Sequence, residues 1–159
     1  SPWFTEKEEQ LISRPNFIGV HVRIGNYAKL PSKGVVGEKY YERSLSLLSA
    51  LGHRLPIVVF SDSPDEVRNM KLWQKFGDVT FFDSTGANSS LETLLLMSLS
   101  SHLVIGNSTF SWWAGWIGNE PNREVVYPRP WMNTQRFDDR DLAVPGWIGV
   151  SREDIRHYE

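Results

Sequence analysis

The sequence contains no cysteine, which excludes disulfides, thiol nucleophiles and cysteine-ligated zinc sites. No apolar run approaches the ~20 residues that a membrane-spanning helix needs. The first residues, SPWFTEKEEQ, are acidic and polar and therefore unlike a signal peptide. The formal net charge is only −2, which argues against a general nucleic-acid binder. A local basic pocket for a phosphate is still compatible with that balance.

Several sequence motifs of common enzyme classes are also missing. The chain has neither the GxGxxG pattern of dinucleotide oxidoreductases nor the GxxxxGK[ST] loop of nucleoside triphosphatases. It has no HExxH pattern, and its four histidines are scattered, so we expect no metal and no other cofactor. A GxSxG elbow is absent as well, which argues against a serine hydrolase.

The composition is that of a globular protein, with 40% hydrophobic and 23% charged residues in a chain of 159. That length suits one domain with a full core, so we treat residues 1–159 as a single domain. Residues 1–14 could form a helical appendage at its N-terminus. The chain does not begin with methionine, and we therefore expect it to be a processed or excised piece.

Short apolar runs alternate with helical patterns along the chain, and the runs read as buried strands. We expect strands at 17–22, 56–61, 79–83, 103–106, 124–127 (ended by Pro128) and 147–150. We expect a loop at 23–37 and helices at 6–13, at 38–51, and after Ser63, Ser89 and Ser108. Capping boxes are predicted for the pairs Thr5/Glu8, Ser63/Glu66 and Ser89/Glu92. The predicted inward faces carry Tyr41, Leu45 and Leu48, then Val67, Met70 and Trp73, then Leu91, Leu94, Leu95 and Leu99, and part of the Trp112, Trp113 and Trp116 cluster.

This alternation predicts an α/β fold, with a doubly wound, mostly parallel sheet and helices on both faces. Ligands of such sheets bind beyond the carboxyl ends of the strands. The polar segments 23–27, 61–62, 83–88 and 107–111 all follow predicted strands. They should therefore gather at one edge of the sheet and form a binding site there.

Arg23 is the first candidate in that site, because its guanidinium fork suits phosphate oxygens and Gly25 lets the backbone approach a ligand. An exposed arginine beside a turn glycine is an equally good interpretation. His21 lies inside the same strand pattern, where a histidine is more often a core residue than a catalyst.

Ser108 and Thr109 precede the tryptophan-rich helix, and a helix N-terminus with free N–H groups can bind an anion. A plain helix cap over an aromatic core is the alternative. Asp62 could accept hydrogen bonds from a base or a ribose, or could be only a turn residue. Glu92 could accept from a guanine edge, or serve only as the capping-box partner of Ser89.

The joint pattern is more specific than its parts. HVRIGNY, YYERSL, VVFSDSPDEV, LLLMSLSSHLVIGNSTFSWWAGW and YPRPW follow one another between residues 17 and 150. In order and spacing they resemble the α-1,2-fucosyltransferase family. The resemblance implies an inverting, metal-independent transferase of GT-B architecture, a fold of two Rossmann-like domains that face a cleft. Such an enzyme moves L-fucose from GDP-β-L-fucose to a sugar hydroxyl.

The matching motifs belong to the carboxyl-terminal, donor-binding half of that family. By resemblance, Arg23 would hold the donor pyrophosphate and stabilise the leaving group. Ser108, Thr109 and Ser111 would add donors, and the turns after the second and third strands would lie near the nucleoside. The expected donor site is completed by His21, Asn26, Asp62, Glu92 and Asn107. No general base can be named.

The sequence departs from the family pattern at three positions. The usual His-x-Arg-Arg-Gly-Asp-Tyr carries Ile24 and Asn26 here, and the usual aspartate before the tryptophan-rich segment is Thr93, with Glu92 as a stand-in. The family's amino-terminal domain, which supplies much of the acceptor side, is not in this chain. We therefore expect weak donor binding and little transfer from this piece alone. A noncatalytic nucleotide- or glycan-binding module is the alternative. A bacterial cytoplasmic setting fits the sequence, and a lumenal parent protein would look similar.

Overall fold

The computed structural model describes residues 1–13, 16–30, 34–87, 90–132 and 138–152. Its strands form a six-stranded sheet in the order β3-β2-β1-β4-β5-β6. Every neighbouring pair is parallel. The strands are β1 Ile18–Val22, β2 Ile57–Ser61, β3 Val79–Phe81, β4 His102–Val104, β5 Val125–Arg129 and β6 Ile148–Ser151.

This strand order reverses direction between β1 and β4, as in a doubly wound Rossmann-like sheet, so the predicted fold class is confirmed. The α-helices are α1 Pro2–Ile12, α2 Glu38–Ala50, α3 Pro64–Arg68, α4 Ser90–Ser98 and α5 Thr109–Ile117. The 3-10 helices are η1 Gly25–Lys29, η2 Lys71–Lys75 and η3 Arg140–Leu142. None of the helices in the described residues combines the length and apolar character needed to cross a bilayer.

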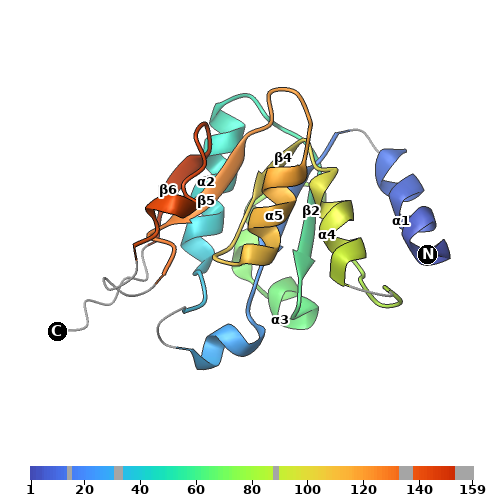
Figure 1. The fold of residues 1–159 in the computed structure, drawn as a ribbon, viewed down its shortest axis with the longest axis horizontal. Coiled ribbons are helices and arrows are strands. Elements are labelled where there is room, and N and C mark those ends of the chain that lie inside the picture. Colours follow the sequence, from blue (N-terminus) through green and yellow to red (C-terminus); the bar gives the residue numbers. More distant parts are fainter. Residues whose placement is uncertain (14–15, 31–33, 88–89, 133–137, 153–159) are drawn as a thin grey trace.

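Helices cover the sheet on both faces (Figure 1). Helix α2 packs on one face, where Tyr40, Tyr41, Leu45 and Leu48 join the core. Helices α1, α4 and α5 pack on the other face, and α4 contacts both α1 and α5. Helix α1 contributes its buried Leu11 to that second core, so it is packed on the domain.

Successive side chains of a strand point to opposite faces of the sheet, and this decides which of them line the pocket. Val20 and Val22 of β1 point into the core beneath α2. His21, between them, therefore points to the face of α4 and α5, where its ring lies 5.5 Å from that of Phe110. Phe60 of β2 lies in the core of the same face. The α4 and α5 face thus receives a histidine and an aromatic ring near the carboxyl ends of two strands.

Several local predictions were wrong. Helix α1 begins at Pro2 because Ser1, not Thr5, caps it and accepts from the Phe4 amide. The predicted loop after β1 contains η1. Helix α3 ends at Arg68, so Trp73 reaches the core from the separate η2.

Other predictions failed where neighbouring elements override local sequence. The buried residues of α4 are Leu96 and Met97, while Leu91 and Leu95 are exposed. Of the residues predicted to face inward, only Leu94 and Leu99 pack against the core. Strand β5 continues through Pro128 to Arg129, because β6 pairs alongside it. On α5, Trp112 is partly buried against the core and Trp113 and Trp116 are exposed, so the prediction that part of this cluster is core is confirmed. Ser89 of the predicted capping box lies outside the described residues.

Candidate functional site

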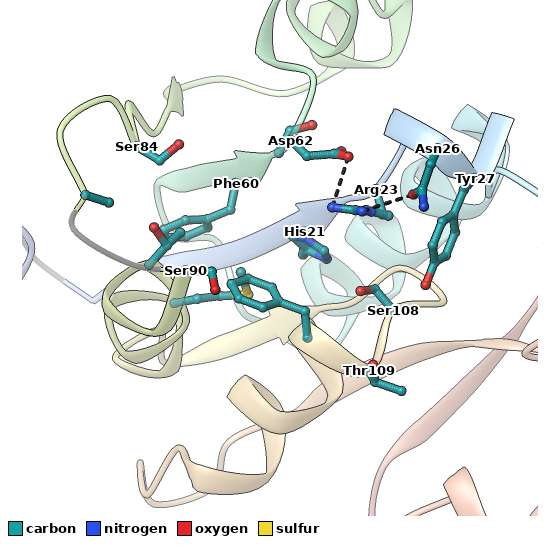
Figure 2. A pocket seen from close by; sticks show the side chains of 15 residues that line it. His21, Arg23, Asn26, Tyr27, Phe60, Asp62, Ser84, Ser90, Ser108 and Thr109 are labelled. Atoms are coloured by element: carbon teal, nitrogen blue, oxygen red, sulfur yellow. Dashed lines mark hydrogen bonds and ion pairs between the residues drawn. The ribbon is translucent and has the colours of Figure 1, made fainter. Parts of the chain in front are cut away.

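A pocket of about 630 Å³ opens at the carboxyl ends of β1 and β2 and the N-terminus of α5. Its walls come from five places in the sequence: β1 with η1, the end of β2, the turn after β3, helix α4, and the start of α5. Figure 2 shows side chains of these elements surrounding one space. The structure therefore forms a pocket where the strand order reverses, as the sequence predicted.

Arg23 and Ser108 lie on this one pocket, together with Thr109. The Arg23 side chain is about one third exposed and pairs with Asp62 through Nη1 and Oδ2, 3.0 Å apart. Its Nη2 donates to Asn26 Oδ1 at 3.1 Å. The carboxylate and the amide hold the guanidinium at the pocket wall, so a charged donor group is already oriented there.

His21 lines the pocket beside Arg23, and only 4% of its surface is exposed. Burial, with a smaller contribution from the Arg23 charge, lowers the pKa of His21 to about 3. The imidazole is therefore neutral at pH 7, with one nitrogen able to donate and the other able to accept. Its Nδ1 is buried and has no hydrogen-bond partner among the described residues. Such an unsatisfied group is costly unless a ligand pairs with it.

The N-terminus of α5 forms the opposite part of the wall. Ser108 occupies the N-cap position, but its hydroxyl makes no capping hydrogen bond. In Figure 2, Ser108 and Thr109 lie at the start of α5, below Arg23 and Asn26 in the view. The first-turn amides of a helix have no intrahelical acceptor and carry partial positive charge. This end of the pocket can therefore accept an anion from two sides.

The other end of the pocket is neutral. Its described walls carry the aromatic rings of Phe60 and Phe110, the thioether of Met97, and hydroxyls; the hydroxyl-bearing residues are Ser61, Ser84, Ser90 and Thr93. Apolar surface with a few hydroxyls suits a flat, polar-edged group such as a nucleoside. Ser84 comes from the turn after β3, and Ser61 is the last residue of β2.

Three predicted site residues do not line the pocket. Glu92 turns toward α1, where its carboxylate pairs with the Ser1 amino group at 3.2 Å. Asn107 is buried and donates to the Gly34 carbonyl at 3.1 Å, bridging the end of β4 to the segment before α2. Ser111 is fully buried and donates to the Ser108 carbonyl. The binding roles predicted for these three residues receive no support from their positions.

Sequence reasoning did not select Phe60, Phe110 or Met97 as wall residues, and it included Tyr27 only as part of the segment 23–27. Phe60 could have been found, because side chains alternate along a strand and Phe60 stands next to the end of β2, where the binding edge was predicted. Phe110 directly follows Thr109 in the first turn of α5. Nothing in the sequence pointed to Met97, because the inward face of α4 was predicted incorrectly.

The described residues contain no group of three or more His, Asp or Glu side chains placed to hold a metal ion. The strand order, the switch-point pocket and its cationic end define the class: a Rossmann-like α/β domain with an arginine-bearing pocket at the carboxyl edge of its sheet. Residues 6–151 match the model of Glycosyl transferase family 11, and the chain belongs to that family.

Relatives of known name agree with the family. An α-1,2-colitosyltransferase of Escherichia coli is 28% identical over 143 residues, which cover 86% of this chain and 48% of the relative. Human galactoside α-(1,2)-fucosyltransferase 1 is 26% identical over 142 residues, covering 86% of this chain and 39% of that protein. This chain thus spans less than half the length of either relative.

A likeness to solved structures supports the fold. The crystal structure of POFUT1 in complex with GDP has a TM-score of 0.54 and 14% sequence identity, over 80% of this chain and 46% of that one. The apo form of the same protein gives the same TM-score of 0.54. At that identity the likeness concerns the course of the backbone.

Proposed function

We propose that this chain is the donor-binding domain of a fucosyltransferase-like enzyme that transfers L-fucose from GDP-fucose to a sugar hydroxyl with inversion. Membership of Glycosyl transferase family 11 and the names of the relatives support the chemistry. The GDP in the POFUT1 crystal structure supports a guanine nucleotide donor. The observation that carries the proposal is the convergence of Arg23, His21 and the α5 N-terminus on one pocket.

In this proposal the diphosphate lies between Arg23 and the first turn of α5, and the nucleoside lies toward Phe60 and Ser84. Negative charge grows on the leaving diphosphate as the bond to the sugar breaks. A fixed guanidinium and the α5 amides stabilise that charge more in the transition state than in the ground state. No metal is needed for this step. The acceptor hydroxyl requires a general base, which we assign to the part of the protein outside this chain, together with the acceptor site.

Isothermal titration of the chain with GDP, guanosine and UDP tests the proposal. We expect GDP to bind, and guanosine to bind at least about 30-fold more weakly because hydrogen bonds to charged groups contribute about 1.5–3 kcal/mol each. Arg23→Ala should weaken GDP binding by a similar factor. Absence of GDP binding, or GDP binding that Arg23→Ala leaves unchanged, refutes the proposal.

The second candidate is a noncatalytic nucleotide- or glycan-binding module derived from such an enzyme. Ile24 and Asn26 favour it, because the usual family pattern carries a second arginine and an aspartate at these positions. Addition of a radiolabelled GDP-fucose donor and a galactoside acceptor separates the two. Transfer by the full-length parent protein supports the enzyme, whereas nucleotide binding by the parent protein without transfer supports the module.

A further inference from the structure

Asp62, at the end of β2, has both carboxylate oxygens engaged by the segment that follows β1. Its Oδ2 lies 3.0 Å from Arg23 Nη1. Its Oδ1 accepts a hydrogen bond from the Ile24 backbone N–H at 3.0 Å. Figure 2 shows the carboxylate directed at the guanidinium. The sequence predicted a contact to the nucleoside from Asp62, whereas the structure directs this side chain to Arg23.

The chain around Asp62 is built to keep it there. The Ser63 backbone N–H donates to Ser61 Oγ at 3.0 Å, and the Gly25 N–H donates to Ser63 Oγ at 3.3 Å. Gly25 has a φ of +24°, and a Cβ at that position would collide with Asp62 Oδ2. The Ser63 hydroxyl is therefore used to join two loops, and not to cap α3 as the sequence predicted.

Arg23 is held from its other side by η1. Asn26 Oδ1 accepts from Nη2 at 3.1 Å, and the Tyr27 ring centroid lies 5.4 Å from the guanidinium carbon. An unrestrained arginine loses most of its rotamer freedom when it binds a phosphate, whereas a guanidinium already held in place loses little. Groups that lock a binding side chain in this way raise its affinity without touching the ligand.

We propose that Asp62 is a positioning residue, which acts on the donor diphosphate through Arg23 and does not contact the nucleoside. The proposal rests on the function proposed above. One effect opposes it, because the negative charge of Asp62 repels a diphosphate. That charge is compensated at short range by the Arg23 guanidinium and the Ile24 N–H, and the remaining repulsion is weakened by solvent and salt. The gain from holding Arg23 in place therefore outweighs it.

Asp62→Asn is the informative variant, since the amide can keep an oxygen for the Ile24 N–H. It removes the charge and places an NH2 group, which cannot accept a hydrogen bond, opposite Arg23 Nη1. Its matched control is Asp65→Asn, which removes an exposed carboxylate on α3 that pairs with Arg68. The probes are inorganic pyrophosphate and GDP. We expect Asp62→Asn to weaken both by the same factor, about 5- to 10-fold for one oriented charge-assisted bond. Asp65→Asn should leave both unchanged, and Asp62→Asn should add nothing in an Arg23→Ala background.

Weaker GDP binding with unchanged pyrophosphate binding would identify a nucleoside contact and overturn the proposal. Tighter binding of pyrophosphate would show that repulsion dominates and overturn it too. A ligand-free measurement separates this proposal from the proposed function. The ¹⁵N relaxation of the Arg23 Nε–H should report a rigid side chain in the wild type and a mobile one in Asp62→Asn. A mobile Arg23 in the wild type refutes the positioning role, whereas failure of the wild type to bind GDP refutes the proposed function.

Discussion

The carboxyl and amino edges of the sheet carry similar residue types, but these side chains differ in whether they have hydrogen-bond partners within the protein. Each edge has a buried histidine, a serine and an arginine on or next to neighbouring strands. At the carboxyl edge, His21 Nδ1 has no partner among the described residues, and the Ser108 hydroxyl caps nothing. Both residues face the pocket of about 630 Å³.

At the amino edge, the histidine and the serine are satisfied by the protein itself, although Arg123 Nε is buried without a partner among the described residues. His102 Nδ1 accepts from the Glu124 backbone N–H at 3.1 Å. Ser100 Oγ accepts from Arg123 Nη2 at 3.0 Å and donates to the Met97 carbonyl at 2.9 Å. A second pocket of about 350 Å³ lies at this edge, lined in part by His53 and Arg54.

Residue type alone therefore does not distinguish a binding edge from a structural one. What distinguishes them is whether the buried histidine and serine have partners within the protein. Groups satisfied internally stabilise the fold, while unsatisfied groups that line a pocket are available to a ligand. Variants at matched positions on the two edges should separate effects on folding from effects on binding.

Among the matched variants, the serine pair should show the largest difference between an effect on stability and an effect on GDP binding. Ser100→Ala removes a partner of the partly buried Arg123 guanidinium, and we expect the free energy of unfolding to fall by about 1.5–3 kcal/mol. GDP affinity should not change. Ser108→Ala should weaken GDP binding by about 5-fold, near 1 kcal/mol, with no loss of stability. Urea denaturation and isothermal titration on both variants measure the two effects.

A loss of stability in Ser108→Ala would mean that its hydroxyl caps α5 after all. Substitution of a capping serine by alanine costs about 1 kcal/mol of stability. In that case the serines of both edges would be satisfied within the protein, and the two edges would differ only in their location.

Much of this fold could be predicted from the sequence. The strands stand within a few residues of their predicted ranges, because a buried parallel strand reads as a short apolar run whatever packs on it. The inward face of α4 could not be predicted, since leucines at positions 94, 95, 96 and 99 give no single helical stripe. Only the placement of α1 and α5 decides which of them is buried.

The location of the pocket was predicted better than the ion pairs and hydrogen bonds of the residues assigned to it. Arg23, Ser108 and Asp62 were placed at the correct edge because each follows a strand of a parallel sheet. The pairing of Asp62 with Arg23 could not be predicted, because it joins residues 39 positions apart through two loops. Glu92 was misassigned for the same reason, as its partner is the amino group of Ser1, directly before α1.

The histidine pair should show a smaller difference of the same kind between stability and GDP binding. Phenylalanine keeps the shape of the ring approximately and removes both nitrogens. His102→Phe leaves the Glu124 N–H without its acceptor and should cost about 1 kcal/mol of stability, with GDP affinity unchanged. His21→Phe removes an unsatisfied buried nitrogen, so stability should hold or rise, while GDP binding weakens by about 10-fold. Equal losses of stability in the two variants would contradict the claim that His102 has a partner within the protein and His21 has none.

The pH dependence of stability should report the titration of His102. Burial and the nearby charges of His53 and Arg123 lower the pKa of His102 to about 4, from an ordinary value near 6.5. Between those values the unfolded chain binds a proton that the native state resists, so stability falls as pH falls from about 6.5 toward 4. Urea midpoints at pH 7.5, 6 and 5 should decline in the wild type and decline less in His102→Phe. Parallel declines in the two proteins would mean that His102 titrates normally.

The smallest effect should come from the amino-edge cation Arg54. A five-residue strand such as β2 separates the two edges by about 16 Å at ~3.3 Å per residue. The Debye length is about 10 Å at 0.1 M salt and about 30 Å at 0.01 M. Arg54→Ala should therefore change GDP affinity less than about 2-fold at 0.1 M salt and weaken it slightly more at 0.01 M. Arg23→Ala, measured beside it, should stay strongly impaired at both salt concentrations because its guanidinium contacts the ligand directly. A salt-independent loss of GDP binding in Arg54→Ala would place the nucleotide at the amino edge and invert the assignment of the two pockets.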